Sequence, residues 1–178
     1  MNLLFEKKIK IFVLLLLIIF LALLLMFIPY KKALTFLQPE ENDILCYVPI
    51  AAEDTFKIWY KHSIHLSDVI ESYKVTEQDT IRQYELEYQD FAIGMPSEAA
   101  EGESFEIKDG KYFLKNMNRE FEHFDLRVGQ VRANHTFVQG NLHYPLSKAI
   151  EPGTRVRIQI RKISFIQQME GVNILDDK

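Results

Sequence analysis

The sequence predicts an all-β fold, either an antiparallel β-sandwich or a partly open barrel of about eight strands, preceded by one N-terminal transmembrane helix. The evidence is one long apolar run near the N-terminus, period-two alternation that recurs after it, and turn residues between the alternating segments. The chain has 178 residues, 48% of them apolar, which suits one globular domain and one additional element.

The apolar run covers residues 11–28 without a charged side chain. As a helix it rises about 1.5 Å per residue, which brings it close to the roughly 30 Å hydrocarbon core of a bilayer. A signal peptide is the alternative, because lysines precede the run. A signal core has only about 7 to 15 apolar residues, however, and a small-x-small cleavage pattern follows it. The following "PYKKALTF" lacks that pattern, so a retained anchor is favoured.

Lysines flank the run on both sides, with Lys7, Lys8 and Lys10 before it and Lys31 and Lys32 after it. The positive-inside rule favours a cytoplasmic N-terminus and an extracytoplasmic C-terminal domain, and a cytoplasmic domain is the alternative. The single cysteine fits either compartment. We expect a cytoplasmic stub and anchor over 1–32, a short tether over 33–43, the β domain over 44–170 and a polar tail over 171–178.

The part beyond residue 32 is acidic, with 16 basic and 24 acidic residues and a net charge of −8. An acidic domain without arginine clusters has no electrostatic footprint for nucleic acid, so nucleic-acid binding is excluded. The sequence has no glycine-rich phosphate loop and no internal repeat, and we expect no cofactor. The membrane is the partner that the N-terminal helix indicates.

Alternating segments predict the strands. In "TRVRIQIRK" the residues Val156, Ile158 and Ile160 share one face and polar residues share the other, which is typical of a half-buried antiparallel strand. Asp109-Gly110 predicts a two-residue hairpin turn between "FEIK" and "KYFL". A second, weaker hairpin is predicted at the Gly-Asn pair in "TFVQGNLHYPL". The remaining strand segments, in chain order, are "DILCYVPI", "TFKIWYKH", "ESYKVTE", "TIRQYELEYQDF" and "HFDLRVG".

The stretch 58–73, "IWYKHSIHLSDVIESY", concentrates aromatic and polar side chains and is the candidate site. If strand geometry holds to residue 63, the apolar face of the strand ends in His62, whereas Trp59 and Ser63 point to the opposite side. The following "HLSD" is typical of a connection between two strands.

Three interpretations of this stretch remain open. In the first, His62 and Glu71 satisfy hydrogen bonds across adjacent strands. In the second, His62, His65 and one of Asp68 or Glu71 ligate a metal such as zinc, although a spacing of three puts the two histidines on opposite faces of a regular strand. In the third, Ser63 is a nucleophile with a histidine base and Glu71 as orienting carboxylate, although no nucleophile-elbow glycines surround it. We assign no catalytic residue and no metal ligand.

The order of several short pieces resembles the domain of unknown function 1850 family: the tryptophan, a His-Ser pair, a downstream glutamate and a later Gly-Met segment in "AIGMP". The resemblance runs from about residue 44 to residue 161, and His65 is an addition to the simplest pattern. The residues that carry it are Trp59, His62, Ser63, Glu71, Gly94 and Met95.

The resemblance implies a small bacterial protein that is membrane-anchored or exported and often encoded beside the membrane component of a TRAP-type solute transporter. It implies no particular reaction or ligand. We therefore expect a binding or accessory module with a transporter subunit as partner, in which the six matching residues form a recognition rim. A structural envelope protein without a specific ligand and a Ser/His hydrolase are the alternatives.

Overall fold

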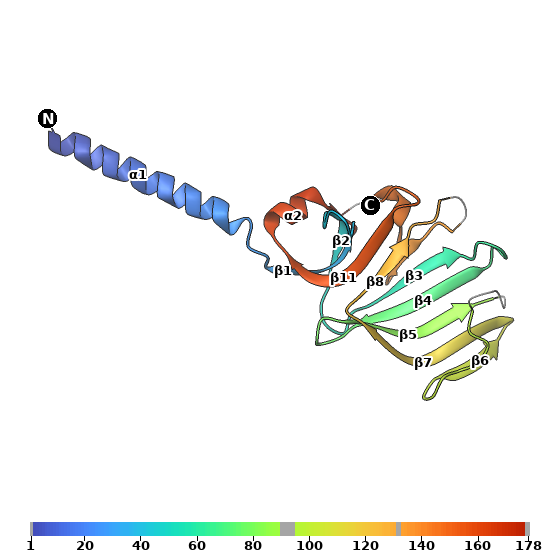
Figure 1. Cartoon of the computed structure of the whole chain (residues 1–178). Helices are drawn as coiled ribbons and strands as arrows, with labels where there is room; N and C mark the ends of the chain where they lie inside the picture. The colour runs from blue at the N-terminus through green and yellow to red at the C-terminus, as the bar shows by residue number, and fades with distance from the viewer. Residues whose placement is uncertain (1, 90–94, 131–132, 177–178) are drawn as a thin grey trace.

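The N-terminal apolar run forms helix α1, Asn2–Leu25, in the computed structural model of the chain, which describes residues 2–89, 95–130 and 133–176 (Figure 1). Its segment Phe5–Leu25 has 21 residues and is long and apolar enough to cross a membrane, a criterion that a signal sequence also meets. The helix begins before the apolar run because the glutamate and lysines that precede the run are themselves good helix formers. It ends ahead of Pro29, which cannot continue a helix.

The rest of the chain forms two β-sheets. The smaller sheet has the strand order β12-β2-β1-β11-β8, and all of its pairs are antiparallel except β12 on β2. Its strands are β1 (Lys31–Leu37), β2 (Ile44–Pro49), β8 (His123–Arg127), β11 (Arg155–Ile163) and β12 (Val172–Asn173).

The larger sheet is antiparallel throughout, with the strand order β10-β9-β3-β4-β5-β7-β6. Its strands are β3 (Thr55–Lys61), β4 (Asp68–Val75), β5 (Ile81–Tyr88), β6 (Ser104–Lys108), β7 (Lys111–Phe121), β9 (Thr136–Gln139) and β10 (Leu142–Pro145). A 3-10 turn, η1 (Leu146–Lys148), follows β10, and a short helix, α2 (Phe165–Glu170), follows β11.

Aromatic side chains from both sheets fill the space between them. Phe56 of β3 stacks on Tyr73 of β4 at 5.2 Å and on Phe137 of β9 at 5.8 Å between ring centroids. Phe36 of the smaller sheet meets Phe137 edge-on at 6.1 Å. The two sheets thus pack face to face over a shared core, which confirms the all-β prediction in its sandwich form rather than as a barrel.

Both predicted hairpin turns are present. Asp109 and Gly110 have φ of 52° and 75°, and they join β6 to β7 in the register Lys108↔Lys111. Positive φ at both central positions is what a two-residue hairpin turn requires. The second hairpin joins β9 to β10 at Gly140, whose φ is also positive.

The expectation of a tether over 33–43 is wrong, because most of that segment belongs to β1, a central strand between β2 and β11. Leu34 and Phe36 enter the main core, while Ala33 and Thr35 are buried on the opposite face. A strand with both faces covered shows no alternation of apolar and polar residues, which is why the pattern did not predict it.

The expected polar tail also begins too early. Residues 172–173 form β12 on the edge of the smaller sheet, and Ile174 is buried in the main core. Before β12, α2 lies on the outer face of that sheet, where the hydroxyl of Tyr47 in β2 donates to the carbonyl of Gln168. The folded domain therefore extends over residues 31–174 and begins five residues after Met26.

Candidate functional site

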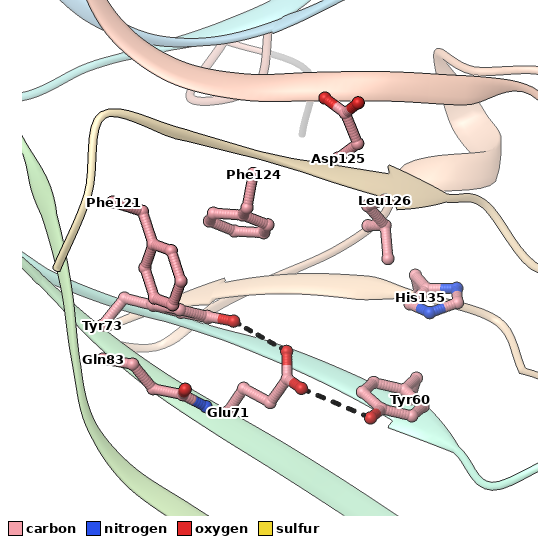
Figure 2. A pocket seen from close by; sticks show the side chains of 9 residues that line it. All are labelled: Tyr60, Glu71, Tyr73, Gln83, Phe121, Phe124, Asp125, Leu126 and His135. Carbon is pink, nitrogen blue, oxygen red and sulfur yellow. Dashed lines mark hydrogen bonds between the residues drawn. The ribbon is translucent and has the colours of Figure 1, made fainter. Parts of the chain in front are cut away.

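A pocket of about 400 Å³ opens between the two sheets, where the chain passes from β7 in the larger sheet to β8 in the smaller one (Figure 2). Strands β3, β4 and β5 form one wall, and β8 forms the opposite wall. Small-molecule sites usually occupy about 300 to 1,000 Å³. The lining residues are Tyr60, Glu71, Tyr73, Gln83, Phe121, Phe124, Asp125, Leu126 and His135.

Glu71 is the central polar group of this pocket. Alternation along β4 turns Val69, Glu71 and Tyr73 toward the interior, so an acidic side chain lies on a face that is otherwise apolar. The Tyr73 hydroxyl donates to Oε2 of Glu71 at 2.8 Å, and the Tyr60 hydroxyl of β3 donates to Oε1 at 3.4 Å. Figure 2 shows the carboxylate between these two hydroxyls and directed toward β8.

Burial raises the pKa of the Glu71 carboxyl above its usual range, and the hydrogen bonds from Tyr73 and Tyr60 oppose that shift. Burial, together with the neighbouring Glu71, also raises the pKa of both phenols. The two tyrosines therefore remain protonated donors at neutral pH. A ligand in the pocket would therefore affect the protonation of Glu71 rather than that of the two tyrosines.

His135 closes one end of the pocket. Its ring stacks on Tyr60 with 4.9 Å between centroids, and its Nδ1 accepts a hydrogen bond from the Gly129 amide at 3.0 Å. Burial lowers the pKa of His135 to about 4, so the ring is neutral at neutral pH. Because Nδ1 is an acceptor, the single proton resides on Nε2, and His135 is a fixed neutral donor.

Aromatic rings form the remaining wall. Tyr73 is held between Phe56 and Phe124, with 5.0 Å between the centroids of Tyr73 and Phe124. Phe121 meets Phe124 edge-on at 6.2 Å. These contacts fix the Tyr73 hydroxyl in place, so the donor that binds Glu71 is preorganised.

Asp125 also borders the pocket, but Figure 2 shows its carboxylate pointing away from Glu71. Asp125 pairs with Arg155 and Arg157 of β11, with 2.9 Å from Arg157 Nε to Asp125 Oδ1. The two guanidinium groups lower the pKa of this carboxyl to about 2. Over residues 2–89, 95–130 and 133–176, no ion pair involves Glu71, so it is the unpaired acid of the pocket.

Trp59, singled out from the sequence, lies on the other face of the larger sheet. Its Nε1 donates to Oδ1 of Asp68 at 2.7 Å, and its ring meets His143 edge-on at 6.2 Å. Lys61 pairs with the same carboxylate at 2.7 Å. Trp59 thus helps line a separate, smaller hollow of about 280 Å³ on the outer face, away from Glu71.

His62, Ser63 and His65 occupy the turn that follows β3. The turn is closed by backbone bonds from His62 to Ser67 at 2.9 Å and from Leu66 to His62 at 3.0 Å. The rings of His62 and His65 are 5.8 Å apart, and Ser63 is exposed. In the described part of the chain, no hydrogen bond joins Ser63 to either histidine, and no group of three His, Cys, Asp or Glu side chains is placed to hold a metal.

Met95 packs against a second apolar cluster, whose buried residues come from β4, β5 and β7 of the larger sheet and include Val69 and Leu86. Gly94 lies outside the described residues. Among the predicted rim residues that are described, the structure brings His62 and Ser63 together in one turn. It places Glu71 in the pocket, Trp59 on the outer face and Met95 in the second cluster.

The family model described as Domain of unknown function (DUF1850) matches residues 56–146, slightly more than half of the chain. The chain belongs to the DUF1850 family. The resemblance inferred from the Trp, His-Ser, Glu and Gly-Met pieces is thereby confirmed, over a shorter range than expected. No curated protein and no solved structure matches the chain.

The DUF1850 match begins in β3 and ends at η1, so it contains β8 and all of the larger sheet except Thr55. Every residue that lines the Glu71 pocket falls within it. Helix α1 and strands β1 and β11 lie outside it. The pocket is therefore a feature of the DUF1850 segment itself.

Sequence reasoning found Glu71 but missed the side chains that surround it. Tyr60 and Tyr73 carry a usable signal, because each shares the interior face of its strand with buried apolar residues and β3 and β4 are neighbours. Phe124 and His135 carry no such signal. Phe124 lies on β8, after the chain has crossed to the smaller sheet, and His135 lies in the loop before β9.

Proposed function

We propose that this DUF1850 protein is a membrane-anchored, extracytoplasmic binding module whose inter-sheet pocket holds a small organic cation against Glu71. We further propose that it serves as an accessory to a TRAP-type solute transporter. α1 provides a helix long enough for the anchor. The observation that carries the ligand proposal is the unpaired Glu71 carboxylate among aromatic rings.

A carboxylate removed from water is costly unless a counter-charge or sufficient hydrogen bonds replace its hydration. Glu71 accepts two hydrogen bonds from neutral phenols, which leaves its negative charge without a balancing cation among the described residues. A ligand ammonium group would supply that charge. Its binding would lower the pKa of Glu71, because an adjacent positive charge favours the ionised carboxyl.

The aromatic rings suit the same ligand. Phe121, Phe124 and Tyr73 surround the space in front of the carboxylate, and aromatic faces attract cations within about 6 Å of the ring centroid. The Nε2 proton of His135 offers one further donor for a hydroxyl or carbonyl of the ligand. An organic anion would be repelled by Glu71, so we exclude dicarboxylates as occupants of this pocket.

The ligand is tested by thermal unfolding of the full chain in detergent, with n-butylammonium, choline or spermidine added and succinate as the anionic comparison. A ligand that binds only the folded state raises Tm. We expect a cation to raise Tm of the wild type but not of Glu71→Gln, which keeps the side-chain size and removes the charge. Glu85→Gln of β5, outside the pocket lining, is the matched control. A rise with succinate, or an equal rise in Glu71→Gln, would contradict the proposal.

The transporter partner is tested by purification of the tagged full chain from its native membranes. We propose that the exposed turn at His62 and Ser63 contacts the transporter, because Ile64 and Leu66 in the same turn expose apolar side chains. A TRAP membrane subunit is expected to copurify with the wild type and with His143→Ala, and to be lost from His62→Ala. Purification without any transporter subunit would favour a structural envelope role.

A further inference from the structure

Five exposed apolar side chains gather where α1 joins the β domain. Three belong to the segment that follows α1 and two belong to α2. They are Phe27, Ile28, Tyr30, Phe165 and Met169, and together they are named the juxtamembrane patch. Single exposed apolar residues are ordinary on protein surfaces, whereas a contiguous group marks a contact with another apolar phase.

The sequence of α2 fixes which of its side chains face outward. Ser164 and Gln167 form a capping box that starts the helix, with the Gln167 amide donating to the Ser164 hydroxyl and the Ser164 amide donating to the Gln167 side chain. Phe165 and Met169 are four residues apart and therefore share one face. Both are exposed, Met169 by 69%, while the opposite side of α2 rests on Tyr47 of β2.

Hydrogen bonds tie α2 to the end of the membrane helix. The Ile166 amide donates to the Met26 carbonyl at 3.2 Å, and Nε2 of Gln168 donates to the Tyr30 hydroxyl at 3.1 Å. The Tyr30 amide in turn donates to the Ile163 carbonyl at 3.1 Å, at the end of β11. Residues 26–30 and α2 are thus held as one unit, and Figure 1 shows α2 at the end of the domain that α1 enters.

We propose that the juxtamembrane patch lies in the lipid headgroup region of the leaflet from which the domain emerges, with Phe165 and Met169 in contact with lipid. The proposal rests on α1 being a retained anchor. The uncharged residues 11–28 extend about 27 Å at the rise of a helix, close to the thickness of the hydrocarbon core, so Met26 lies near its boundary. A helix bonded to Met26 lies at the same depth.

The chemistry of the patch is that of a membrane interface. Tyr30 combines an apolar ring with a polar hydroxyl, the residue type enriched at headgroup level. Lys31 follows it at the start of β1, and Lys162 is exposed at the end of the neighbouring β11. These positive charges complement anionic headgroups. A short helix with an apolar face held beside the span is an interfacial helix in this setting.

The test uses a fluorescent label on the full chain in vesicles of equal parts phosphatidylcholine and phosphatidylglycerol, with a nitroxide on the acyl chain near the glycerol as quencher. The native Cys46 is buried and burial raises its pKa, so a new surface cysteine is labelled selectively. Met169→Cys places the label on α2. Ile107→Cys of β6 is the matched control, because Ile107 is 65% exposed, as Met169 is 69% exposed. β6 is the edge strand of the larger sheet and lies on the side of the domain away from α1 (Figure 1).

We expect the lipid quencher to remove most of the fluorescence at position 169 and to leave the label at position 107 unaffected. Glu170→Cys, which keeps both apolar side chains of α2, is expected to be quenched more than position 107. Equal quenching at positions 169 and 107 overturns the proposal. Self-quenching between labels at position 169, without lipid quenching, also overturns it and identifies a second copy as the occupant. Failure of the protein to float with the vesicles overturns the anchor on which the proposal rests.

Discussion

Burial acts in opposite directions on the two ionisable groups of the pocket. It disfavours the charged form of each, so it raises the pKa of Glu71 and lowers the pKa of His135 to about 4. At neutral pH the histidine is therefore a neutral donor. Of these two groups, Glu71 is the one that can be charged at neutral pH. His135 contributes ring packing against Tyr60 and a hydrogen-bond donor.

This difference predicts a pH-dependent stability. The pKa of His135 falls from its ordinary 6.5 to about 4, so the unfolded chain binds more protons between these values and stability falls as pH drops through that window. His135→Gln is expected to lose less stability than the wild type between neutral and about pH 4, by at most about 3 kcal/mol, because the pKa falls from 6.5 to about 4 and each pKa unit represents roughly 1.4 kcal/mol. Urea unfolding followed by Trp59 fluorescence at both pH values measures it.

His143→Gln, a change at an exposed histidine of β10, is the control and should keep the wild-type pH dependence. The raised pKa of Glu71 has the opposite effect, because here the folded state binds more protons than the unfolded chain. The contribution of Glu71 to the free energy of unfolding therefore falls as pH rises above 4.5. A His135→Gln curve parallel to the wild type would show that this ring is not held neutral.

Among the elements, the contrast between β11 and β1 shows what a sequence pattern can reveal. β11 has one buried and one exposed face, so its alternation of isoleucine and arginine predicts it. β1 is covered on one face by the larger sheet, and on its other face Ala33 is buried in a small cluster with Ile44, Tyr47 and Ile163. Alternation of apolar and polar residues therefore does not predict β1. β12 has only two residues, too few for any periodicity.

The site follows the same logic. The interior position of Glu71 is readable from the alternation of β4, and its hydrogen bond to Tyr60 from the pairing of β3 with β4. The aromatic wall is not readable, because Phe124 arrives from a strand in the other sheet. Local periodicity predicts which side of a strand a residue faces, whereas the opposing wall of a pocket depends on how distant strands are packed.

The place of β1 in the core predicts that Phe36→Ala is strongly destabilising. Phe36 is fully buried and contacts Phe137, and removing a buried phenylalanine side chain typically costs about 3 to 5 kcal/mol. Ile107→Ala, on an exposed surface, is expected to change the free energy of unfolding by less than about 0.5 kcal/mol. Chemical unfolding measures the free energy of unfolding of both variants. If residues 33–43 were a tether, Phe36→Ala would change that free energy as little as Ile107→Ala does.

At the scale of the molecule, α1 is connected almost directly to the central strand β1. Only residues 26–30 separate α1 from β1, and backbone bonds at Met26 and Tyr30 hold them against α2 and β11. The structure therefore shows no flexible linker between α1 and the smaller sheet. With α1 as the proposed anchor, these hydrogen bonds set the distance of the domain from the membrane surface.

This arrangement predicts where the chain tolerates truncation. A fragment of residues 31–178 is expected to fold, with a far-ultraviolet spectrum dominated by β-structure and a cooperative melt. A fragment of residues 44–178 lacks β1, which leaves β2 and β11 without the strand between them. We expect it to lose cooperative unfolding, since each strand edge buried by β1 becomes exposed. Equal melts for the two fragments would show that β1 is dispensable.

The pairing of β1 with β11 also sets the order in which the protein is completed. Lys31 pairs with Ile163, so β1, the first strand to be synthesised, cannot pair with β11 until nearly the whole chain has been made. The neighbouring strands β3, β4 and β5 pair with one another soon after they emerge, because the loops between them are short. The smaller sheet, which follows α1, is therefore completed only when residues 157–163 have been synthesised. A chain that stalls earlier keeps an unpaired strand edge beside α1.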